Sequence, residues 1–170
     1  MIYICRRTNH KTNEFKDLIK RLNIPFVASW NASDILSNEY ALYLGRPGIN
    51  GQRGANLAVQ NCDLLISIGS HLCIPITGTR ADVFAREAKK IMVDIDPVEI
   101  DNSIIPLDLS IQCDSKKYLM NMLGNVTKNK GIGAWLKKCG KYKTYNKTSS
   151  ECERSKKRVN PYSYVDALYD

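Results

Sequence analysis

The sequence predicts an α/β fold in which about six strands form one parallel, doubly wound sheet. Short apolar segments alternate with amphipathic segments of helical periodicity as far as about residue 125. Two of the apolar segments, DLLISIG (63–69) and IMVDID (91–96), are almost uninterrupted, which is typical of strands buried on both faces. Strands that alternate with helices of about 10–15 residues form right-handed βαβ units, and such units build a parallel sheet.

Each element follows from its local pattern. The helix expected at 13–22 has Phe15, Leu18, Ile19 and Leu22 at helical spacing. The other expected helices are 52–61, TRADVFAREAKK (79–90) and 114–123. The expected strands are 2–5, 24–30, 40–44, 63–69, 91–96 and 109–113.

The pattern changes after residue 125. AWLKKCGKY (134–142) predicts a helix that leaves the domain, and NPYSYVDALYD (160–170) predicts the start of another helix. Asn160 would be the N-cap of that helix and Pro161 its first-turn residue. We therefore interpret residues 1–125 as the α/β domain, and 126–170 as a basic helical linker leading into a missing C-terminal domain.

Composition narrows the class of protein. Residues 1–115 hold 12 Lys+Arg and 13 Asp+Glu, whereas residues 116–170 hold 13 and 4, so the excess positive charge lies in the last third. A solvated helix face explains such charge more often than a nucleic-acid partner does. No apolar run reaches the roughly 18 residues of a membrane span, and the start is not a signal peptide. The six cysteines include no C-x-x-C pair, so we expect reduced thiols, a cytoplasmic protein and no metal site.

Three segments are expected to meet at the carboxyl edge of the sheet, where open parallel sheets bind ligands. The first is GRPGINGQRGAN (45–56), whose arginines suit a phosphate and which precedes a helix N-terminus. The others are IGSHL (68–72) and DIDP (94–97), in which Asp94 could accept hydrogen bonds from ribose hydroxyls. Simpler explanations stay open: the glycines could serve tight turns, and His71 could make a structural hydrogen bond.

Asp96, Pro97 and Glu99 fit a helix capping box, which leaves Asp94 as the better ligand candidate. No arrangement of nucleophile, base and acid is recognisable. The sequence therefore predicts no catalytic residue.

Several of these segments resemble a known family. YLGRPGINGQRGANLAVQNCDLLISIGSHL, TGTRADVFAREAKKIMVDIDPVEIDN and LDLSIQCDSKKYL are similar, in this order, to the central domain of thiamine-diphosphate-dependent enzymes of the acetolactate synthase type. The resemblance implies a Rossmann-like, three-layer domain of six parallel strands. It also implies that thiamine diphosphate and Mg²⁺ belong only to the full-length enzyme, a homo-oligomer that decarboxylates a 2-keto acid and joins the product to an acceptor. The catalytic domains are absent from this sequence, so further domains or a partner subunit would supply them.

The resemblance also places an FAD or ADP site in this domain. The residues concerned are Gly48, Gly51, Gly69, Ser70, His71, Asp94, Ile95, Cys113 and Asp114. Flavin-binding members carry a segment like GARFDDRVTG, and here it reads GSHLCIPITG. His71 and Pro75 replace its two arginines, which argues against FAD.

Three functional hypotheses follow. The first is the central domain, or a fragment, of an acetolactate synthase-like enzyme, inactive by itself. The second is a stand-alone module that binds an adenine nucleotide such as ADP, FAD or NAD. The third is an interaction protein that docks through its basic residues 116–170.

Overall fold

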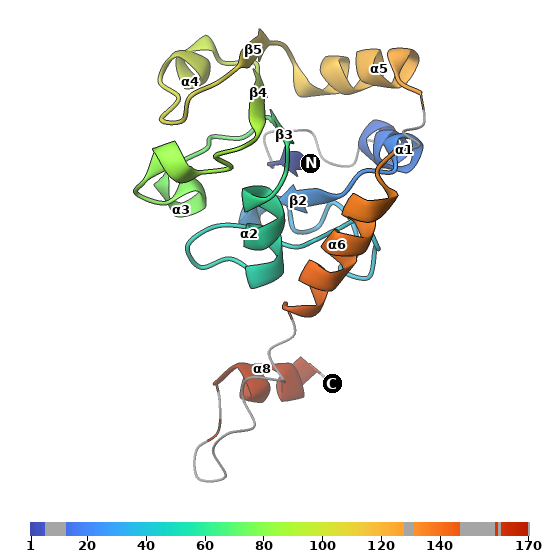
Figure 1. Cartoon of the computed structure of the whole chain (residues 1–170), viewed down its shortest axis with the longest axis vertical. Helices are drawn as coiled ribbons and strands as arrows, with labels where there is room; N and C mark the ends of the chain where they lie inside the picture. Colours follow the sequence, from blue (N-terminus) through green and yellow to red (C-terminus); the bar gives the residue numbers. More distant parts are fainter. Residues whose placement is uncertain (6–12, 128–130, 147–158, 160, 170) are drawn as a thin grey trace.

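Five parallel strands form the centre of the chain, in the spatial order β2-β1-β3-β4-β5 (Figure 1). The computed structural model describes residues 1–5, 13–127, 131–146, 159 and 161–169. The strands are β1 (Ile2–Ile4), β2 (Phe26–Ala28), β3 (Leu64–Ile68), β4 (Lys89–Asp94) and β5 (Leu109–Gln112). The predicted α/β fold with a parallel sheet is confirmed.

The segment 40–44 was expected to be a strand, and it contributes one bridge residue. Tyr43 pairs with Phe26 as an isolated parallel bridge beside β2. The segment coils just before this point, because the amide of Tyr43 donates to the carbonyl of Tyr40. The described residues therefore form five strands and one bridge where the sequence predicted about six strands.

Helices cover both faces of the sheet and make three layers. On one face, α1 (Asn13–Leu22) and α5 (Ser115–Asn125) pack over Ile2, Ile4 and their neighbours. On the other face, α2 (Arg53–Gln60) and α6 (Gly133–Thr144) pack over Tyr3 and Leu65. Successive residues of β1 thus enter opposite cores, as the alternation of side chains along a strand requires.

The prediction of a helix at 79–90 is wrong. That segment holds one 3₁₀ turn, η2 (Ala81–Val83), and β4 already begins at Lys89. Its composition favours a helix, but Phe84 is buried and Ala85 adopts a positive φ of 45°. Lys89 then pairs with Leu64 of β3, so tertiary packing overrides the local helix propensity.

The basic segment after residue 130 was expected to leave the domain as a helix. The helix exists, but it packs along α2, and the buried Cys139 joins one of the two hydrophobic cores. A side-chain amide reinforces the contact, because Asn146 accepts a hydrogen bond from the Gly54 amide (2.7 Å) and donates one to the Leu44 carbonyl (2.8 Å). The domain boundary after residue 125 stays a prediction.

The remaining short elements are η1 (Trp30–Ala32), α3 (Ile74–Thr77), α4 (Pro97–Asp101) and α8 (Pro161–Tyr169). Helix α8 confirms the predicted last helix, while its expected N-cap, Asn160, lies outside the described residues. No helix in the described part of the chain is long and apolar enough to cross a membrane.

Candidate functional site

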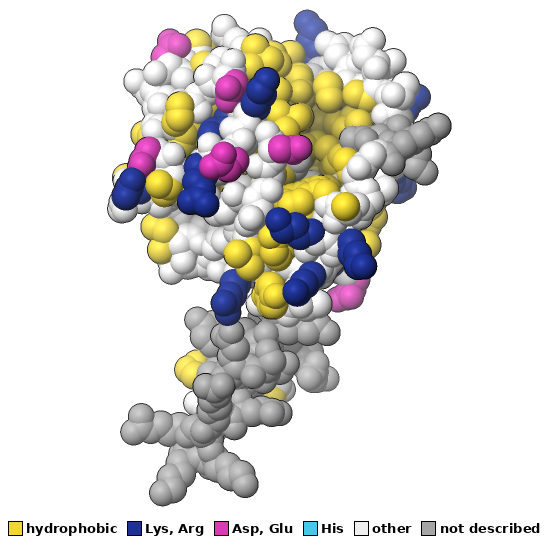
Figure 2. All heavy atoms as spheres, viewed as in Figure 1, with side chains coloured by type: hydrophobic (Ala, Val, Ile, Leu, Met, Phe, Trp, Pro, Cys, Tyr) yellow, Lys and Arg dark blue, Asp and Glu magenta, His cyan; other side chains and the backbone are white. Residues whose placement is uncertain are grey.

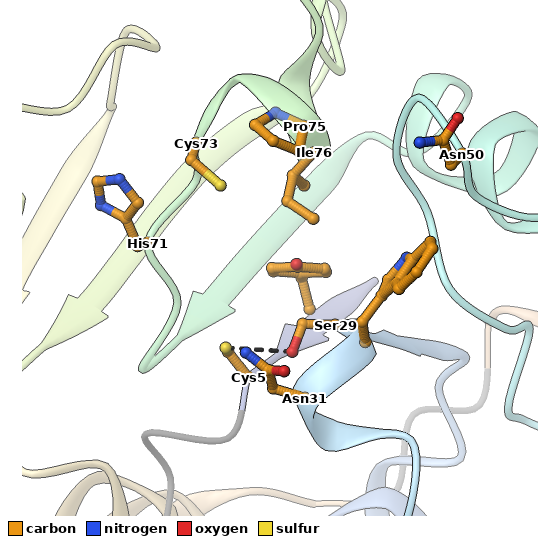
Figure 3. A pocket seen from close by; sticks show the side chains of 10 residues that line it. Cys5, Ser29, Asn31, Asn50, His71, Cys73, Pro75 and Ile76 are labelled. Atoms are coloured by element: carbon orange, nitrogen blue, oxygen red, sulfur yellow. Dashed lines mark hydrogen bonds between the residues drawn. The ribbon is translucent and has the colours of Figure 1, made fainter.

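A pocket of about 510 Å³ opens where β1, β2 and β3 end (Figure 3). Strand β1 lies between β2 and β3, so the order of strands along the chain reverses at this point. Ligands of open α/β sheets bind at such a switch point, beyond the carboxyl ends of the strands. The lining residues that the structure describes are Tyr3, Cys5, Ser29, Trp30, Asn31, Asn50, His71, Cys73, Pro75 and Ile76.

A buried tyrosine hydroxyl, that of Tyr3, belongs to this site, and the buried Ser70 hydroxyl lies beside it. Tyr3 and Ser70 are each 1% exposed, and no described residue makes a hydrogen bond of ordinary geometry with either side-chain oxygen. The pKa of Tyr3 is raised by burial and partly lowered again by the neighbouring Ser70 hydroxyl. An unpaired buried hydroxyl costs about 1–3 kcal/mol. A ligand atom that hydrogen-bonded to Tyr3 Oη would remove that cost, so this part of the pocket favours a polar ligand.

The walls of the pocket come from the residues that follow β1 and β2. The hydroxyl of Ser29 donates to Cys5 Sγ over 3.1 Å, which joins the ends of the two strands. Next to Ser29, Trp30 leaves 58% of its surface exposed. An exposed indole at a pocket wall is a stacking surface for an aromatic ring. The amides of Asn31 and Asn50 add hydrogen-bonding groups.

His71 lies on the opposite wall, in the loop that leaves β3. Its Nδ1 contacts a carboxylate oxygen of Glu99 in α4, and its side chain is 61% exposed. His71 and Glu99 also line a second pocket of about 280 Å³, together with Met92 and Ser103. The pair therefore lies between the two pockets.

The predicted residues on β4 and β5 form a separate group. Asp94 is 2% exposed; its Oδ1 accepts the Asp96 amide (3.0 Å), and its Oδ2 has no hydrogen-bond partner among the described residues. Cys113 donates its amide to the Asp94 carbonyl (2.9 Å), and Asp114 caps α5 through the Lys117 amide (3.0 Å). None of these residues is among the described residues that line the larger pocket. The predicted site is thus divided along the sheet edge.

The predicted capping at Asp96 is present, because its Oδ1 accepts the Val98 amide (2.9 Å) and Pro97 occupies the first helical position. Ile95, between the two aspartates, is 64% exposed. Asp94 and Asp96 therefore differ in role: Asp96 caps α4, while Asp94 has one buried oxygen without a hydrogen-bond partner among the described residues.

Five backbone amides of the glycine loop already donate hydrogen bonds within the protein. The amides of Arg46, Gly48, Ile49, Gly51 and Gln52 all donate to acceptors of the protein, with Gly48 bound to Asn56 Oδ1 at 2.8 Å. A phosphate cradle needs such amides to point at the ligand. The expectation that this loop holds a phosphate through its backbone is therefore not supported, although its Asn50 lines the pocket.

Its glycines have structural reasons. Gly48 has φ of +129°, and a Cβ there would lie 2.6 Å from the Pro75 carbonyl oxygen. A Cβ on Gly51 would lie 2.5 Å from the carbonyl carbon of Pro47. Gly69 also has a positive φ, 57°, where the chain turns out of β3 towards His71. The glycines thus shape the loops around the pocket.

The sequence reasoning missed Tyr3, Cys5, Ser29, Trp30, Asn31 and Asn50. The signal was available, because the rule for carboxyl strand ends applies to β1 and β2 as well as to β3 and β4. It did not stand out, since these positions carry no charged or glycine-rich motif. A buried tyrosine in the first strand reads as ordinary core until its hydroxyl is found unpaired.

Comparison with known proteins places this fold in a family. The family described as "Thiamine pyrophosphate enzyme, central domain" matches residues 1–122. The acetolactate synthase large subunit of Cyanidium caldarium is 36% identical over 147 residues, which is 82% of this chain and 24% of that protein. A probable acetolactate synthase large subunit of Methanocaldococcus jannaschii is 35% identical over 112 residues (66% of this chain, 19% of the relative).

The acetolactate synthase isozyme 2 large subunit of Escherichia coli (strain K12) is 32% identical over 104 residues, or 61% of this chain and 19% of the relative. The chain therefore spans a quarter or less of the length of these relatives. The match covers all five strands of the sheet and both walls of the pocket. The chain belongs to the thiamine pyrophosphate enzyme central-domain family.

Proposed function

We propose that this chain is the central domain of an acetolactate synthase-like enzyme, and that its pocket binds an adenine nucleotide. The relatives are named acetolactate synthase large subunits, and the chain matches about a fifth to a quarter of their length. In the full-length enzyme we expect decarboxylation of a 2-keto acid and carboligation, carried out by thiamine diphosphate in other domains or in a partner subunit. The role of this domain is then structural and ligand-binding.

The described residues do not suit the thiamine cofactor itself. No group of three or more His, Cys, Asp or Glu side chains in the described part of the chain could hold a metal ion. The diphosphate of thiamine diphosphate is held in proteins together with Mg²⁺, which prefers carboxylate and other oxygen ligands. We therefore assign no step of the reaction to residues of this chain.

The observation that carries the nucleotide proposal is the pocket at the β1/β3 switch point. Its volume of about 510 Å³ falls within the roughly 300–1,000 Å³ of small-molecule sites. Trp30 supplies a stacking face for a purine, and the buried Tyr3 Oη, which has no hydrogen-bond partner among the described residues, supplies a hydroxyl for a ring nitrogen or a ribose oxygen.

Asp94 lies further along the sheet edge. Strand β4 lies three strands from β2, after which Trp30 follows, a distance of about 14 Å at the normal strand spacing. A ligand whose base stacks on Trp30 therefore has to extend beyond its ribose to approach Asp94, whose Oδ2 has no hydrogen-bond partner among the described residues. Where flavin-binding members carry arginines, this chain has His71 and Pro75, so we expect ADP or adenosine to bind more tightly than FAD.

Calorimetric titration with adenosine, ADP, NAD and FAD tests this proposal. We expect adenosine and ADP to bind and to quench Trp30 fluorescence, and Trp30→Ala to weaken both by about tenfold or more, because base stacking contributes about 1–3 kcal/mol. Asp94→Asn should leave adenosine binding unchanged, because a nucleoside stacked on Trp30 does not span the distance to β4. Trp135→Phe, on α6, is the matched control and should bind like the wild type. Absence of heat with all four compounds would refute the nucleotide proposal.

The catalytic part of the proposal has its own test. Residues 1–170 supplied with pyruvate, thiamine diphosphate and Mg²⁺ should form no acetolactate. Formation of acetolactate above the protein-free control would contradict the role proposed here.

The basic C-terminal segment gives a nucleic-acid partner less support than the pocket gives a nucleotide. Figure 2 shows Lys and Arg side chains gathered over α6, and Lys137, Lys138 and Lys141 are exposed. Two aromatic residues of this segment, Trp135 and Tyr142, pack on the core with their rings 6.5 Å apart, whereas Tyr145, just after α6, is 43% exposed and has the Arg53 guanidinium over its ring. Stacking on bases needs exposed rings, so the described part of α6 fits a solvated helix face.

A further inference from the structure

The two edges of the sheet differ in how they are covered. At the β2 edge, Tyr43 forms a bridge to Phe26, and the Leu44 amide donates to the Phe26 carbonyl (3.0 Å). Strand β5 forms the other edge, and no described strand pairs with its outer side. Figure 1 shows β5 at the end of the sheet, with α4 and α5 to either side of it. An uncovered edge strand offers its backbone groups to a strand of another chain.

The side chains of β5 do not discourage such pairing. Natural edge strands often carry charged residues or proline, which block the approach of a second strand. Strand β5 reads LSIQ and contains neither. Leu109 leaves 49% of its surface exposed, and Ser110 and Gln112 are exposed as well. Figure 2 shows hydrophobic side chains gathered over this end of the molecule, around β5 and α5. The edge is therefore uncharged and partly apolar.

The backbone of β5 has two residues whose hydrogen-bonding groups point outward. The Asp108 amide donates to the Lys90 carbonyl of β4 (2.9 Å), so the backbone of Asp108 faces into the sheet. The backbone groups of successive strand residues point to opposite edges, so those of Leu109 and Ile111 point away from β4. The side chains of these two residues share one face of the sheet, since they are two positions apart. The outer edge thus offers two amides, two carbonyls and two aliphatic side chains.

We propose that β5 pairs antiparallel with β5 of a second copy of this chain, around a two-fold axis at Ser110. In this register, Leu109 lies opposite Ile111 of the second copy, and the symmetry repeats the pair on the other side of the axis. Each pair exchanges two backbone hydrogen bonds, because these residues carry the outward-pointing groups. The segment LSI is thus its own complement: leucine meets isoleucine on one face, and serine meets serine on the other.

The flanking residues agree with this register. Asp108 lies opposite Gln112 of the second copy, so no like charges meet along the paired strands. A register shifted by two residues towards the end of β5 would place Leu109 opposite Cys113, whose amide is already bound to the Asp94 carbonyl (2.9 Å). That register loses the hydrogen bonds of Leu109 and both leucine–isoleucine pairs. The proposed register therefore makes more contacts.

Sedimentation equilibrium of residues 1–170 tests the association. An interface built from one short strand pair is at the small end of specific interfaces, so we expect a reversible dimer with a dissociation constant on the order of 0.1 mM. Leu109→Lys should weaken the dimer by about tenfold or more, because a lysine at the edge opposes strand pairing. Ile49→Lys is the matched control, since Ile49 is 63% exposed in the glycine loop and its amide donates to the Pro75 carbonyl, away from β5. This control should associate like the wild type.

A cross-linking experiment tests the register. Opposed residues in a non-hydrogen-bonded antiparallel pair have their Cα atoms about 4.5 Å apart, which lies within the roughly 4.4–6.8 Å that a disulfide spans. Ser110→Cys, incubated with oxidised glutathione, should therefore form a covalent dimer, and mass spectrometry should place the bond at position 110. Gln112→Cys is the control, because its two copies would lie on opposite sides of the axis. The wild type measures the background from its six cysteines.

Each outcome decides the proposal. A monomer at concentrations about tenfold above the expected constant would refute it, and would leave the edge for another polypeptide, such as the further domains of the longer relatives. Association that Leu109→Lys does not weaken would also refute it, because the contact would lie elsewhere, for example at the exposed Tyr164 and Leu168 of α8. Cross-linking at position 112 as strong as at position 110 would overturn the register. Where circular dichroism shows that Leu109→Lys is unfolded, the cross-linking of Ser110→Cys decides alone. All of these results are independent of ligand binding in the larger pocket.

Discussion

Replacing Gly54 with alanine tests whether α6 is an integral layer of the domain. Gly54 lies in α2 where α6 crosses it. A Cβ at this position would lie 2.7 Å from Asn146 Oδ1 and closer still to the Tyr142 carbonyl oxygen, where contacts under 3.0 Å are essentially never seen. The helices must separate, or the hydrogen bond from the Gly54 amide to Asn146 must break.

The size of the effect follows from three contributions. Overpacking of this kind costs about 1–3 kcal/mol, and loss of the Asn146 hydrogen bond costs about 1 kcal/mol. Alanine is favoured over glycine within a helix by about 1 kcal/mol, which offsets part of this. We therefore expect Gly54→Ala to lower the free energy of unfolding by about 2 kcal/mol.

Urea denaturation, followed by circular dichroism and by fluorescence of Trp135 on α6, measures the effect. With a slope of about 2 kcal/mol per molar urea, the midpoint should fall by about 1 M. Gly140→Ala on α6 is the matched control, because its added Cβ would meet no atom within 4 Å. It should leave stability unchanged or raise it by up to about 1 kcal/mol. If Gly54→Ala is as stable as Gly140→Ala, α6 does not pack on α2 in solution and the reasoning is refuted.

Two further predictions concern a loop and a buried thiol. Gly48→Ala should destabilise the fold by about 1–3 kcal/mol more than Gly78→Ala does. Both glycines have positive φ, but a Cβ added at Gly48 would lie 2.6 Å from the Pro75 carbonyl oxygen, whereas one added at Gly78 would meet no atom within 4 Å. Equal thermal unfolding of the two variants would show that the loop does not dock on Pro75. Burial raises the pKa of Cys139 from 9.0 to about 12, so its contribution to stability is complete below pH 9 and is lost as the pH rises towards 12. Across this pH window, the free energy of unfolding of the wild type should therefore fall more steeply than that of Cys139→Ala, by about 1.4 kcal/mol per pH unit. Urea denaturation at each pH measures both free energies. If they change with pH in parallel, the result contradicts the burial of this thiol.

Much of the fold could be predicted because the strands are buried on both faces. The apolar runs that form β3 and β4 can pair their backbone hydrogen-bonding groups and bury side chains on both faces only inside a parallel sheet covered by helices. Capping chemistry was equally local at Asp96, which accepts an amide from the first turn of the helix that follows. These features depend on neighbours in the sequence, so pattern alone identified them. Asp114 caps α5 in the same way, although the sequence analysis assigned it to the cofactor site.

The segment 79–90 shows where local information fails. Alanine, arginine, glutamate and lysine all favour helix there, yet burial of Phe84 and the pairing of Lys89 with Leu64 determine its conformation. Helix propensities differ by less than about 1 kcal/mol per residue, whereas burying one large side chain contributes about 1.5–3 kcal/mol. Tertiary packing also decides the position of α6. Its lysines suggested a linker that leaves the domain, but its Cys139 is buried in the core.

The candidate site was predicted in part. The rule of strand ends indicated the edge of the sheet at which the larger pocket opens; of the residues that it named, His71 lines that pocket and Asp94 does not. The glycine loop was interpreted as a phosphate cradle because its composition is the same whether its amides bind an anion or close a turn. Only the fold shows that they donate to Asn56, Pro75 and the loop itself.

By itself, the sequence determined the class of fold, the family and the edge of the sheet where the larger pocket opens, because periodicity, burial and motif order are properties of adjacent residues. Tertiary structure alone decided which side chains meet. It brought Tyr3, Trp30 and His71 from three strand ends to one pocket, paired His71 with Glu99 across 28 residues, and seated α6 on Gly54. These contacts join segments far apart in the chain, so their energies depend on the packed geometry and leave no local pattern in the sequence.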